Sequence, residues 1–464
     1  MIFTNLLLAF QLENYNNSRF LSFIYSRPGF WLLGSERQSL DWTKKAILLL
    51  FLAGIFAILD YVIFYLIFVK LGIIILILLA LLQIILFPIY LVIANFLLIP
   101  LDRYLKNKII NKAKNKLKKY NNLKIIGITG SYGKTSTKEV LKEVLSVKYK
   151  VLASEGNKNT PLGISEVILK TDLSKYEVLI VEMGAYEIGD IAEMCDIVEP
   201  TVGVLTGITY QHLERFKSIE NIKKAKFELP EFIDKSGLVL LDYSNEHIAD
   251  HLDNKANIKA EIIKIKDIEV SYADNFMGFN FDYNNKSFYS KLLAGHSAKN
   301  FVIAYEIGKY FNIKEEKIIE KLAEIEPVEH RLSRIENPNT GVIVIDDSYN
   351  GNFEGVKSTI NMLKNVNNSG KKLYLTPGLV ELGDKSKQVH LEIGKLLTDA
   401  KLDKVLLIEN KGARNIEAGL LKSGFDKENI VFFDTTQEAH KNIGKYLNNS
   451  DAIVFQNDFT DNYF

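Results

Sequence analysis

The stretch KIIGITGSYGKTSTK, residues Lys124–Lys138, has the pattern of a strand, a loop with two glycines and a helix. Lys124–Thr129 is a short β-branched run that predicts a buried strand, and a helix is predicted from Thr135 to about Val147. Between them, Gly130 and Gly133 allow the backbone to wrap around an anion, which the N-terminus of the helix also favours. The stretch therefore predicts a phosphate-binding loop in an α/β domain.

The side chains of this loop predict a nucleotide site. Lys134 would contact the β- and γ-phosphates, and the Thr135 hydroxyl would bind magnesium. The predicted cradle consists of Thr129, Gly130, Ser131, Tyr132, Gly133, Lys134, Thr135 and Ser136. The usual pattern has a glycine five residues before Gly133, where this chain has Ile128. The residues alone therefore also allow a simple strand–helix turn.

Length and composition limit the class of protein. The 464 residues allow two or three domains, and the formal net charge of +1 gives no general electrostatic reason to expect nucleic acid as a partner. The single cysteine, Cys195, excludes a disulfide framework within the chain and a cysteine-rich zinc site. It lies in the apolar helical segment EIGDIAEMCDIV, where a buried and inert thiol is expected.

Ala46–Pro100 is almost wholly apolar and is interrupted chiefly by Asp60, Lys70, Gln83 and Asn95. Because a helix of about 20 apolar residues spans a bilayer, this length predicts two passes, with the break at Lys70–Gly72. Basic residues stand on both flanks: Arg37, Lys44 and Lys45 before, and Arg103, Lys106, Lys108, Lys112, Lys114, Lys116, Lys118 and Lys119 after. The positive-inside rule then places both ends of a transmembrane hairpin in the cytoplasm. The alternative is a buried helical pair in a soluble core.

Three further features of this region bear on how the chain would contact a membrane. Leu6–Leu33 mixes apolar and polar residues and predicts an amphipathic helix on the membrane surface. The basic run Lys106–Lys119 either attracts anionic lipid, at roughly 1 kcal/mol per charge, or is a solvated linker helix. Asp60 is either a functional intramembrane carboxylate or a hydrogen-bonding partner of the other helix. A cleaved signal peptide is not expected, because the apolar region is too long and begins too late.

From Lys124 on, strand-like apolar runs alternate with helix-period segments, as in parallel sheets covered by helices on both faces. The first series is Lys124–Thr129, Glu177–Glu182, Val202–Ile208 and Leu238–Asp242. The second is Val342–Asp346, Lys372–Thr376, Lys404–Ile408, Ile430–Phe433 and Ala452–Phe455, which predicts a separate doubly wound domain. The expected division is a membrane-surface segment at 1–44, the hairpin and basic linker at 45–120, a central domain at 121–327 and a C-terminal domain at 328–464.

Polar residues follow these strands at the edge where open α/β sheets bind ligands. Glu182 ends the run EVLIVEMG and, facing a phosphate loop, is a natural magnesium ligand; a helix-capping or salt-bridged glutamate is the alternative. His212 follows VGVLTGI, where a loop histidine is more often structural than a ligand. Lys226, taken by itself, reads as a solvated helix lysine.

A series of motifs follows the loop in chain order. The first are Gly156-Asn157-Lys158-Asn159, Glu182-Met183-Gly184-Ala185, Gln211-His212-Leu213-Glu214 and Ala225-Lys226-Phe227-Glu228. Then come Gly295-His296 with Asn300, His330-Arg331-Leu332, Asp346–Asn352 and Glu381-Leu382-Gly383 with His390. Over about Lys124–His390 the chain thus resembles the muramyl (Mur) ligases, whose phosphate loop is similarly shortened. The last motifs resemble the family member that adds D-alanyl-D-alanine.

The resemblance implies a central P-loop ATPase domain, a C-terminal Rossmann-like domain and an acyl-phosphate mechanism. A substrate carboxylate attacks the γ-phosphate of ATP, and an amine then displaces phosphate to leave an amide. The implied catalytic residues are Lys134, Glu182, His212 and Lys226. Two magnesium ions are implied, held by Thr135, Glu182, His212 and a carbamylated Lys226.

The resemblance also implies contacts with the substrates. Asn300 would contact adenine, and Arg331 and Asp347 would reach ATP from the C-terminal domain. The other implied substrate-binding residues are Asn157, Asn159, Tyr349, Asn350 and Asn352. The site would be complete only when the two domains close.

The chain departs from the family pattern in places. Soluble members usually begin with a domain that holds the UDP of the substrate, whereas here the loop follows the apolar hairpin directly. Ser297 and Gly207 stand where the family often has asparagine. The segment Phe455–Phe459 lacks the glycine- and methionine-containing turn of the D-alanyl-D-alanine adder. The choice of amine is therefore less defined than the type of reaction.

The sequence predicts an ATP-dependent amide ligase of cell-wall peptide synthesis, anchored on the cytoplasmic face of a bacterial inner membrane. Its expected partners are a muramyl-peptide or lipid-linked precursor, D-Ala-D-Ala or a similar amine, and membrane lipid. One alternative is synthesis of polyglutamate or another amino-acid polymer. An alternative of another class is a membrane-tethered ATP-binding scaffold without turnover, although such a scaffold would not need a second metal site.

Overall fold

The computed structural model describes residues 2–13, 15–26, 40–68, 73–155, 158–209, 213–327, 330–348, 353–380, 382 and 385–457. Contacts divide the chain into two compact units, Met1–Asn111 and Lys112–Phe464. The first unit is helical. The second contains three sheets and their covering helices. The expected boundaries at 44, 120 and 327 remain predictions.

The first unit contains two helices that are long and apolar enough to cross a membrane. They are α4 (Lys44–Phe68) and α5 (Ile73–Leu117), and α5 contains Pro88 and Pro100. Their apolar windows have a mean hydropathy of 2.7 and 2.8. The apolar side chains in the second half of α4 are largely exposed, among them Ile58, Ile63 and Leu66. Such a surface suits contact with lipid better than a soluble core. The predicted break at Lys70–Gly72 lies outside the described residues.

Two short helices, α1 (Ile2–Leu12) and α2 (Asn17–Ser26), pack against the first turns of α4. The expected single helix over Leu6–Leu33 is therefore wrong. The reason lies at Tyr15, whose φ of 56° interrupts a helix, and at Asn16, whose Oδ1 accepts a hydrogen bond of 3.1 Å from the Arg19 N–H. Asn16 thus caps the start of a new helix. Leu7 and Phe10 of α1 are fully buried in this cluster.

Asp60 on α4 contacts two residues of α5. Its Oδ2 accepts hydrogen bonds from Gln83 Nε2 at 3.0 Å and from Tyr90 Oη at 2.7 Å. The reading of Asp60 as a hydrogen-bonding partner between the helices therefore has a structural basis. The basic run Lys106–Lys119 begins on the same helix α5, which ends at Leu117.

In the second unit, the central sheet has six parallel strands in the order β2-β3-β1-β4-β5-β6. The strands are β1 (Lys124–Thr129), β2 (Val151–Ala153), β3 (Val178–Met183), β4 (Val202–Leu205), β5 (Leu238–Asp242) and β6 (Glu261–Ile265). Successive residues of β1 face opposite sides, as a strand requires. Ile126 and Ile128 belong to the core cluster with α6 and α12, whereas Gly127 lies against Leu229 of α10.

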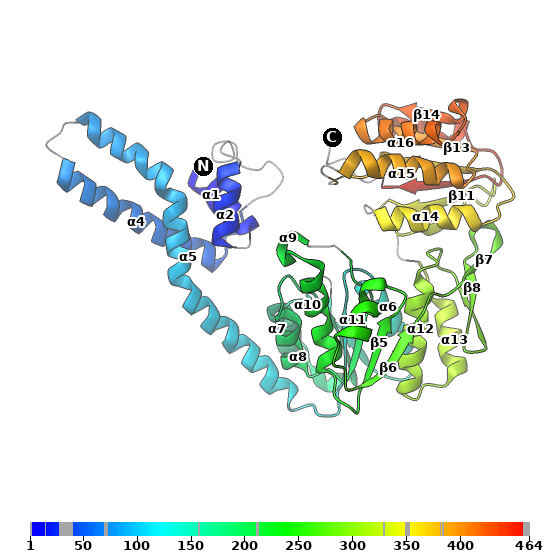
Figure 1. Cartoon of the computed structure of the whole chain (residues 1–464), viewed down its shortest axis with the longest axis horizontal. Coiled ribbons are helices and arrows are strands. Elements are labelled where there is room, and N and C mark those ends of the chain that lie inside the picture. The colour runs from blue at the N-terminus through cyan, green and yellow to red at the C-terminus, as the bar shows by residue number, and fades with distance from the viewer. Residues whose placement is uncertain are drawn as a thin grey trace. The chain divides into compact units, whose positions relative to one another are not determined.

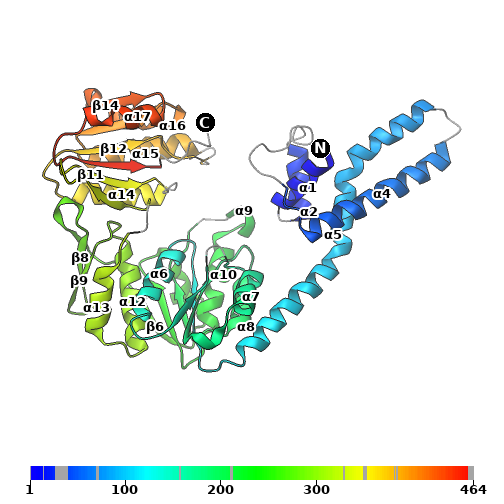
Figure 2. The same cartoon turned by 180° about the vertical axis from the view of Figure 1, so that it is seen from behind.

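Two layers of helices cover this sheet (Figure 1, Figure 2). On one face lie α6 (Lys134–Leu145), α12 (Ser297–Tyr310) and α13 (Glu315–Glu324). On the other lie α7 (Pro161–Lys170), α8 (Asp190–Val198) and α10 (Ile219–Phe232), with α9 (Leu213–Phe216) preceding α10 and α11 (Glu246–Asn254) following β5. Cys195 of α8 is buried, and its burial raises the pKa of the thiol, as expected for an inert cysteine.

A small antiparallel sheet, not predicted from the sequence, joins the central and C-terminal sheets. It consists of β7 (Ser271–Tyr272), β8 (Phe279–Tyr283) and β9 (Lys286–Ser290). Beside it, Phe276 and Leu293 are buried in the same core cluster as C-terminal residues. The Asn275 N–H also donates to Asn367 O at 2.8 Å.

The C-terminal sheet has the order β10-β11-β15-β12-β13-β14. Its strands are β10 (Ser333–Glu336), β11 (Ile343–Asp347), β12 (Lys372–Thr376), β13 (Lys404–Ile408), β14 (Ile430–Phe433) and β15 (Ala452–Gln456), and only β10 is antiparallel to its neighbour. One core cluster contains α14 (Phe353–Asn365), α15 (Ser386–Asp399) and α16 (Lys411–Lys422), and another contains α17 (Thr436–Asn442). The predicted doubly wound domain is confirmed.

Candidate nucleotide and metal site

The phosphate loop connects β1 to α6, and its glycines are required by the backbone. Gly133 has a φ of 76° directly before α6, and Gly130 has a φ of 152°. A Cβ at Gly130 would also overlap the hydroxyl of Thr206. The loop is therefore held close to the end of β4, with the N-terminus of α6 directed at the space it encloses.

The two side chains predicted to contact phosphate and magnesium both lie at the start of α6. Lys134 Nζ donates a hydrogen bond of 2.7 Å to Gly130 O, folding back over the loop. Burial lowers the pKa of Lys134, while the nearby Glu182 carboxylate opposes that shift. Thr135 Oγ1 donates to Glu182 Oε2 at 3.0 Å. Ser136 is exposed in the same turn.

Glu182 lies in β3, which is the neighbour of β1 in the sheet. Its side chain is buried, with only 4% of the residue exposed. Besides Thr135, it faces Lys138 Nζ at 3.8 Å. The salt-bridged alternative therefore has a structural basis, because this ion pair with Lys138 is buried. Glu182 also lies where a carboxylate can share a cation with Thr135.

Lys138 is a member of the site that the sequence did not single out. It is 2% exposed, and its Nζ donates to Ser154 O at 2.8 Å. Ser154 Oγ in turn accepts from the Glu182 N–H at 3.1 Å. The signal was the spacing, because Lys138 stands one helical turn after Lys134 on the same helix.

Lys226 of α10 is buried, with 4% exposed, so its reading as a solvated helix lysine is wrong. Burial, together with the positive charge of Lys134, lowers the pKa of Lys226 to about 7, although the carboxylates of Asp190 and Glu228 oppose the shift. A large fraction of this amine is therefore uncharged near neutral pH. A neutral amine is the form that can react with carbon dioxide to give a carbamate.

The predicted substrate-binding residue Asn159 lies beside the end of β3. Asn159 O accepts from the Gly184 N–H at 2.9 Å, and its side chain packs against Gly184. The predicted adenine contact Asn300 is buried on α12, where its Oδ1 accepts from Thr137 Oγ1 at 3.0 Å. This bond joins α12 to the helix that follows the phosphate loop.

The C-terminal residues occupy a different sheet edge. Arg331 is exposed. Asp347 at the end of β11 is 1% exposed, and its Oδ2 accepts from Thr359 Oγ1 at 2.8 Å. His390 is buried, with Nδ1 2.7 Å from Ser386 O and Nε2 accepting from the Leu379 N–H at 2.9 Å. Both ring nitrogens of His390 are thus used in holding the backbone.

Several predicted site residues lie outside the described residues. They are Asn157, His212, Tyr349, Asn350 and Asn352, together with Glu381 and Gly383 of the C-terminal motif. Within the described part of the chain no group of three or more His, Cys, Asp or Glu side chains could hold a metal ion. The Thr135 hydroxyl and Glu182 carboxylate nevertheless supply oxygen donors beside a phosphate loop, which is the donor set that magnesium prefers.

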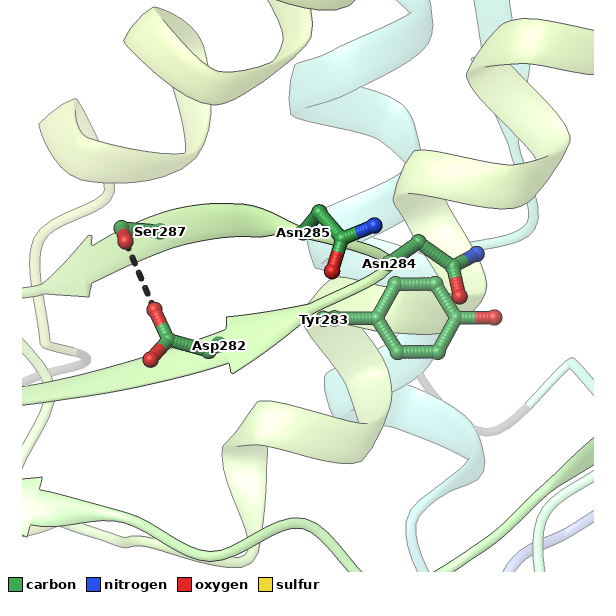
Figure 3. A pocket seen from close by; sticks show the side chains of 5 residues that line it. All are labelled: Asp282, Tyr283, Asn284, Asn285 and Ser287. Atoms are coloured by element: carbon green, nitrogen blue, oxygen red, sulfur yellow. Dashed lines mark hydrogen bonds between the residues drawn. The ribbon is translucent and has the colours of Figure 1, made fainter.

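A pocket lies away from this chemistry at the turn between β8 and β9. Figure 3 shows it lined by Asp282, Tyr283, Asn284, Asn285 and Ser287, with Ser287 Oγ donating to Asp282 Oδ1 at 2.6 Å. None of these residues belongs to the predicted site. The candidate site is therefore the strand edge at the phosphate loop and not this pocket.

Comparison with known proteins identifies relatives along the second unit. Residues 128–308 match the model of the Mur ligase middle domain, and residues 330–456 match that of the Mur ligase, glutamate ligase domain. The chain is 27% identical over 341 residues to the UDP-N-acetylmuramoyl-tripeptide--D-alanyl-D-alanine ligase of Bacillus subtilis, covering 72% of each chain. It is 30% identical over 300 residues to the ligase of that name from Rickettsia prowazekii, covering 61% of this chain and 65% of the relative.

The fold is also similar to that of a solved structure. MurF ligase from Thermotoga maritima in complex with ADP superimposes with a TM-score of 0.61 at 25% identity, covering 76% of this chain and 80% of that one.

Proposed function

The chain belongs to the Mur ligase family, and from this premise we propose that it is an ATP-dependent ligase that adds D-alanyl-D-alanine, or a similar amine, to a muramyl-peptide carboxylate. Relatives named for this reaction match it over 341 and 300 residues. The observation that carries the proposal is the junction of the phosphate loop with Glu182 through the Thr135 hydroxyl. It joins a nucleotide cradle to a buried carboxylate.

The residues of this junction suit transfer of the γ-phosphoryl group. Lys134, now bound to Gly130 O, is placed to turn toward phosphate oxygens. Thr135 and Glu182 would hold Mg²⁺, which when bound neutralises charge on those oxygens. Because the acyl phosphate and the amine both have to be aligned, most of the catalysis is positioning and electrostatic stabilisation.

Lys226 is proposed to act as a carbamate near a second cation, with His212 as a further ligand. Support comes from its burial close to Lys134 and from the lowered pKa of its amine. A buried charged lysine is costly, and the carboxylates of Asp190 and Glu228 offset that cost only in part. Conversion to a carbamate changes the charge of the side chain from positive to negative. The carbamate would then face Lys134 as an attractive partner instead of a repulsive one.

The apolar helices α4 and α5 support the further proposal that the enzyme is held at the cytoplasmic face of a bacterial inner membrane. The flanking basic residues fit the positive-inside rule, and the exposed lysines of α5 would attract anionic lipid. A membrane anchor directly before the catalytic unit favours a lipid-linked acceptor over a UDP-linked one.

The test uses the full chain in detergent micelles with ATP, magnesium and D-Ala-D-Ala. Phosphate release is measured with the UDP-linked tripeptide, with the lipid-linked tripeptide and without an acceptor. Acceptor-dependent release supports the ligase, and its preference between the two forms identifies the substrate. No release with either acceptor, and none when glutamate replaces the dipeptide, would rule out the proposed reaction.

A scaffold without turnover is the second candidate. A scaffold needs to bind a nucleotide, but it does not need a buried lysine near the phosphate loop. This chain has such a lysine, Lys226. Lys226→Ala separates the two: in a ligase it abolishes acceptor-dependent phosphate release, with partial rescue by short carboxylates. In a scaffold it leaves nucleotide binding and the absence of turnover unchanged.

A further inference from the structure

The phosphate loop contains an exposed aromatic residue, Tyr132, whose position is tied to a single glycine. The ring of Tyr132 lies against Gly207, the residue that departs from the asparagine frequent in the family. A Cβ at Gly207 would lie within 2.5 Å of the Tyr132 Oη and would overlap the ring itself. An asparagine therefore cannot stand at 207 while the ring keeps this position.

The backbone of Gly207 does not itself require glycine. Among the described glycines with positive φ, residue 207 is absent, whereas Gly130 and Gly133 of the loop are present. The requirement at 207 is therefore steric and comes from the ring of Tyr132. The ring of Tyr132 therefore fills the space that a side chain at residue 207 would occupy.

Backbone hydrogen bonds join the same two segments. The Ser131 N–H donates to Gly207 O at 2.8 Å, and the Thr206 N–H donates to Thr129 O at 3.0 Å. Thr206 Oγ1 also donates to Tyr132 O, and the Thr209 N–H donates to Ser131 Oγ at 3.1 Å. The loop is thus bound along its length to the residues that follow β4.

The far end of the ring has a third attachment. Tyr132 Oη accepts from Asn245 Nδ2 at 3.3 Å, and the same nitrogen donates to Ile208 O at 3.0 Å. Asn245 Oδ1 accepts from the Ile248 N–H and so caps α11. The ring spans from the loop, across Gly207, to the start of a helix beyond β5. Tyr132 nevertheless remains 46% exposed.

We infer that Tyr132 is a positioning residue whose ring braces the phosphate loop against Gly207 and keeps the cradle formed before the nucleotide binds. This inference rests on the proposed function, in which that loop binds ATP. A loop that is already ordered loses less conformational entropy on binding, so the brace strengthens binding without touching the transferred phosphoryl group.

The test measures ADP binding by calorimetry and the ATP dependence of phosphate release, both with the full chain in detergent. Tyr132→Ala is expected to raise the Kd for ADP and the KM for ATP about tenfold, roughly the cost of ordering one more loop residue. The kcat at saturating ATP should stay within about twofold, because the chemistry is untouched. Tyr132→Phe, which keeps the ring but loses the hydrogen bond from Asn245, should raise the Kd for ADP by less than Tyr132→Ala does.

Gly207→Ala gives an independent test, because its effect on ADP binding should depend on whether the ring of Tyr132 is present. Alone it should weaken ADP binding strongly, because the new methyl group displaces the ring. In the Tyr132→Ala background it should have little further effect, since the clash has been removed.

Two outcomes would overturn the inference. One is unchanged ADP affinity in Tyr132→Ala together with a lower melting temperature, which would mean that the ring serves only stability. The other is an equal effect of Gly207→Ala with and without the ring. If the wild-type protein itself binds no ADP, the proposed function fails as well, so the two failures are distinguishable.

Discussion

Thr135 Oγ1 lies 3.0 Å from Glu182 Oε2, which joins the first turn of α6 to the end of the neighbouring strand β3. Because Glu182 is 4% exposed and also faces Lys138, it is held in one place before any cation binds. As the proposed ligand of Mg²⁺, Glu182 would need little reorganisation when the ion binds.

Glu182→Gln is expected to lower kcat at least about 100-fold, the usual effect of losing one electrostatic contact in the transition state. The amide keeps the size of the side chain but is a poor magnesium ligand. Phosphate release is measured over a magnesium titration, where the variant should need more magnesium. Glu139→Gln is the matched control, since Glu139 is an exposed acid that also faces Lys138, at 3.5 Å. Equal magnesium dependence in the two variants would contradict the role of Glu182.

The lowered pKa of Lys226 predicts a pH dependence of stability. Its pKa is about 7 in the folded protein, against the ordinary lysine value of 10.5. Between these values the unfolded chain binds the proton and the folded protein does not, so this group makes stability rise from pH 7 to about 10.5. Below pH 7 the buried amine is charged, and the folded state bears the full cost of its desolvation.

The check compares chemical unfolding of the wild type and of Lys226→Met across pH 6 to 10, in buffers free of carbon dioxide and bicarbonate so that Lys226 is a free amine. The variant should lose the rise in stability over this range and should be the more stable of the two at pH 6. Lys224→Met, at an exposed position of the same helix, is the control and should keep the wild-type slope. In activity assays, added bicarbonate should stimulate the wild type at pH 8 if the carbamate forms.

Much of this site was predictable because the carboxyl ends of parallel strands gather ligand-binding residues at one edge. The runs at Lys124–Thr129 and Leu238–Asp242 match β1 and β5 residue for residue. The strand expected over Val202–Ile208 ends at Leu205, because the following residues pair with the phosphate loop instead.

Other features depended on tertiary contacts that a sequence does not show. The burial of Lys226 and Lys138 arises where separate helices meet the sheet, since each helix taken alone carries a lysine that looks solvated. The strand β2 has three residues, too few for a pattern to be recognised. The hairpin of β8 and β9 did have a signal, because FNFDY and KSFYS alternate around the turn residues Asn284 and Asn285.

His390 is expected to act on stability and not on the reaction. Ser386 O can only accept and the Leu379 N–H can only donate, so the ring carries its proton on Nδ1 and is neutral. Burial lowers the pKa of His390 below its usual 6.5. As pH falls, His390 is therefore protonated at a higher pH in the unfolded chain than in the folded protein. Stability is lost as pH falls below about 6.5.

His390→Gln should destabilise the protein by about 1–3 kcal/mol at pH 7.5 and should flatten its acid sensitivity. The measurement is thermal or chemical unfolding at pH 5.5 to 7.5. His440→Gln, at an exposed residue of α17, is the matched control. A changed KM for the amine with an unchanged melting temperature would show instead that His390 binds substrate.

A pair of substitutions can decide whether Asp60 is a functional carboxylate or only a hydrogen-bonding partner of the other helix. Its Oδ2 accepts from Gln83 Nε2 and from Tyr90 Oη, and Tyr90 Oη also lies 2.7 Å from Gln83 Oε1. Asp60→Asn keeps an acceptor oxygen, whereas Asp60→Leu removes it. If Asp60 only joins the helices, Asp60→Asn should behave as the wild type, and Asp60→Leu should lose stability by about 0.6–1.7 kcal/mol in detergent.

The loss in Asp60→Leu should be limited because Tyr90 and Gln83 still have each other as partners. Melting temperature and acceptor-dependent phosphate release are measured on the same preparations, with Ile58→Leu, an exposed apolar position on the same helix, as the control. Full stability of Asp60→Asn with loss of activity on a lipid-linked acceptor would contradict the purely structural reading. The negative charge itself would then be needed, as for a functional intramembrane carboxylate.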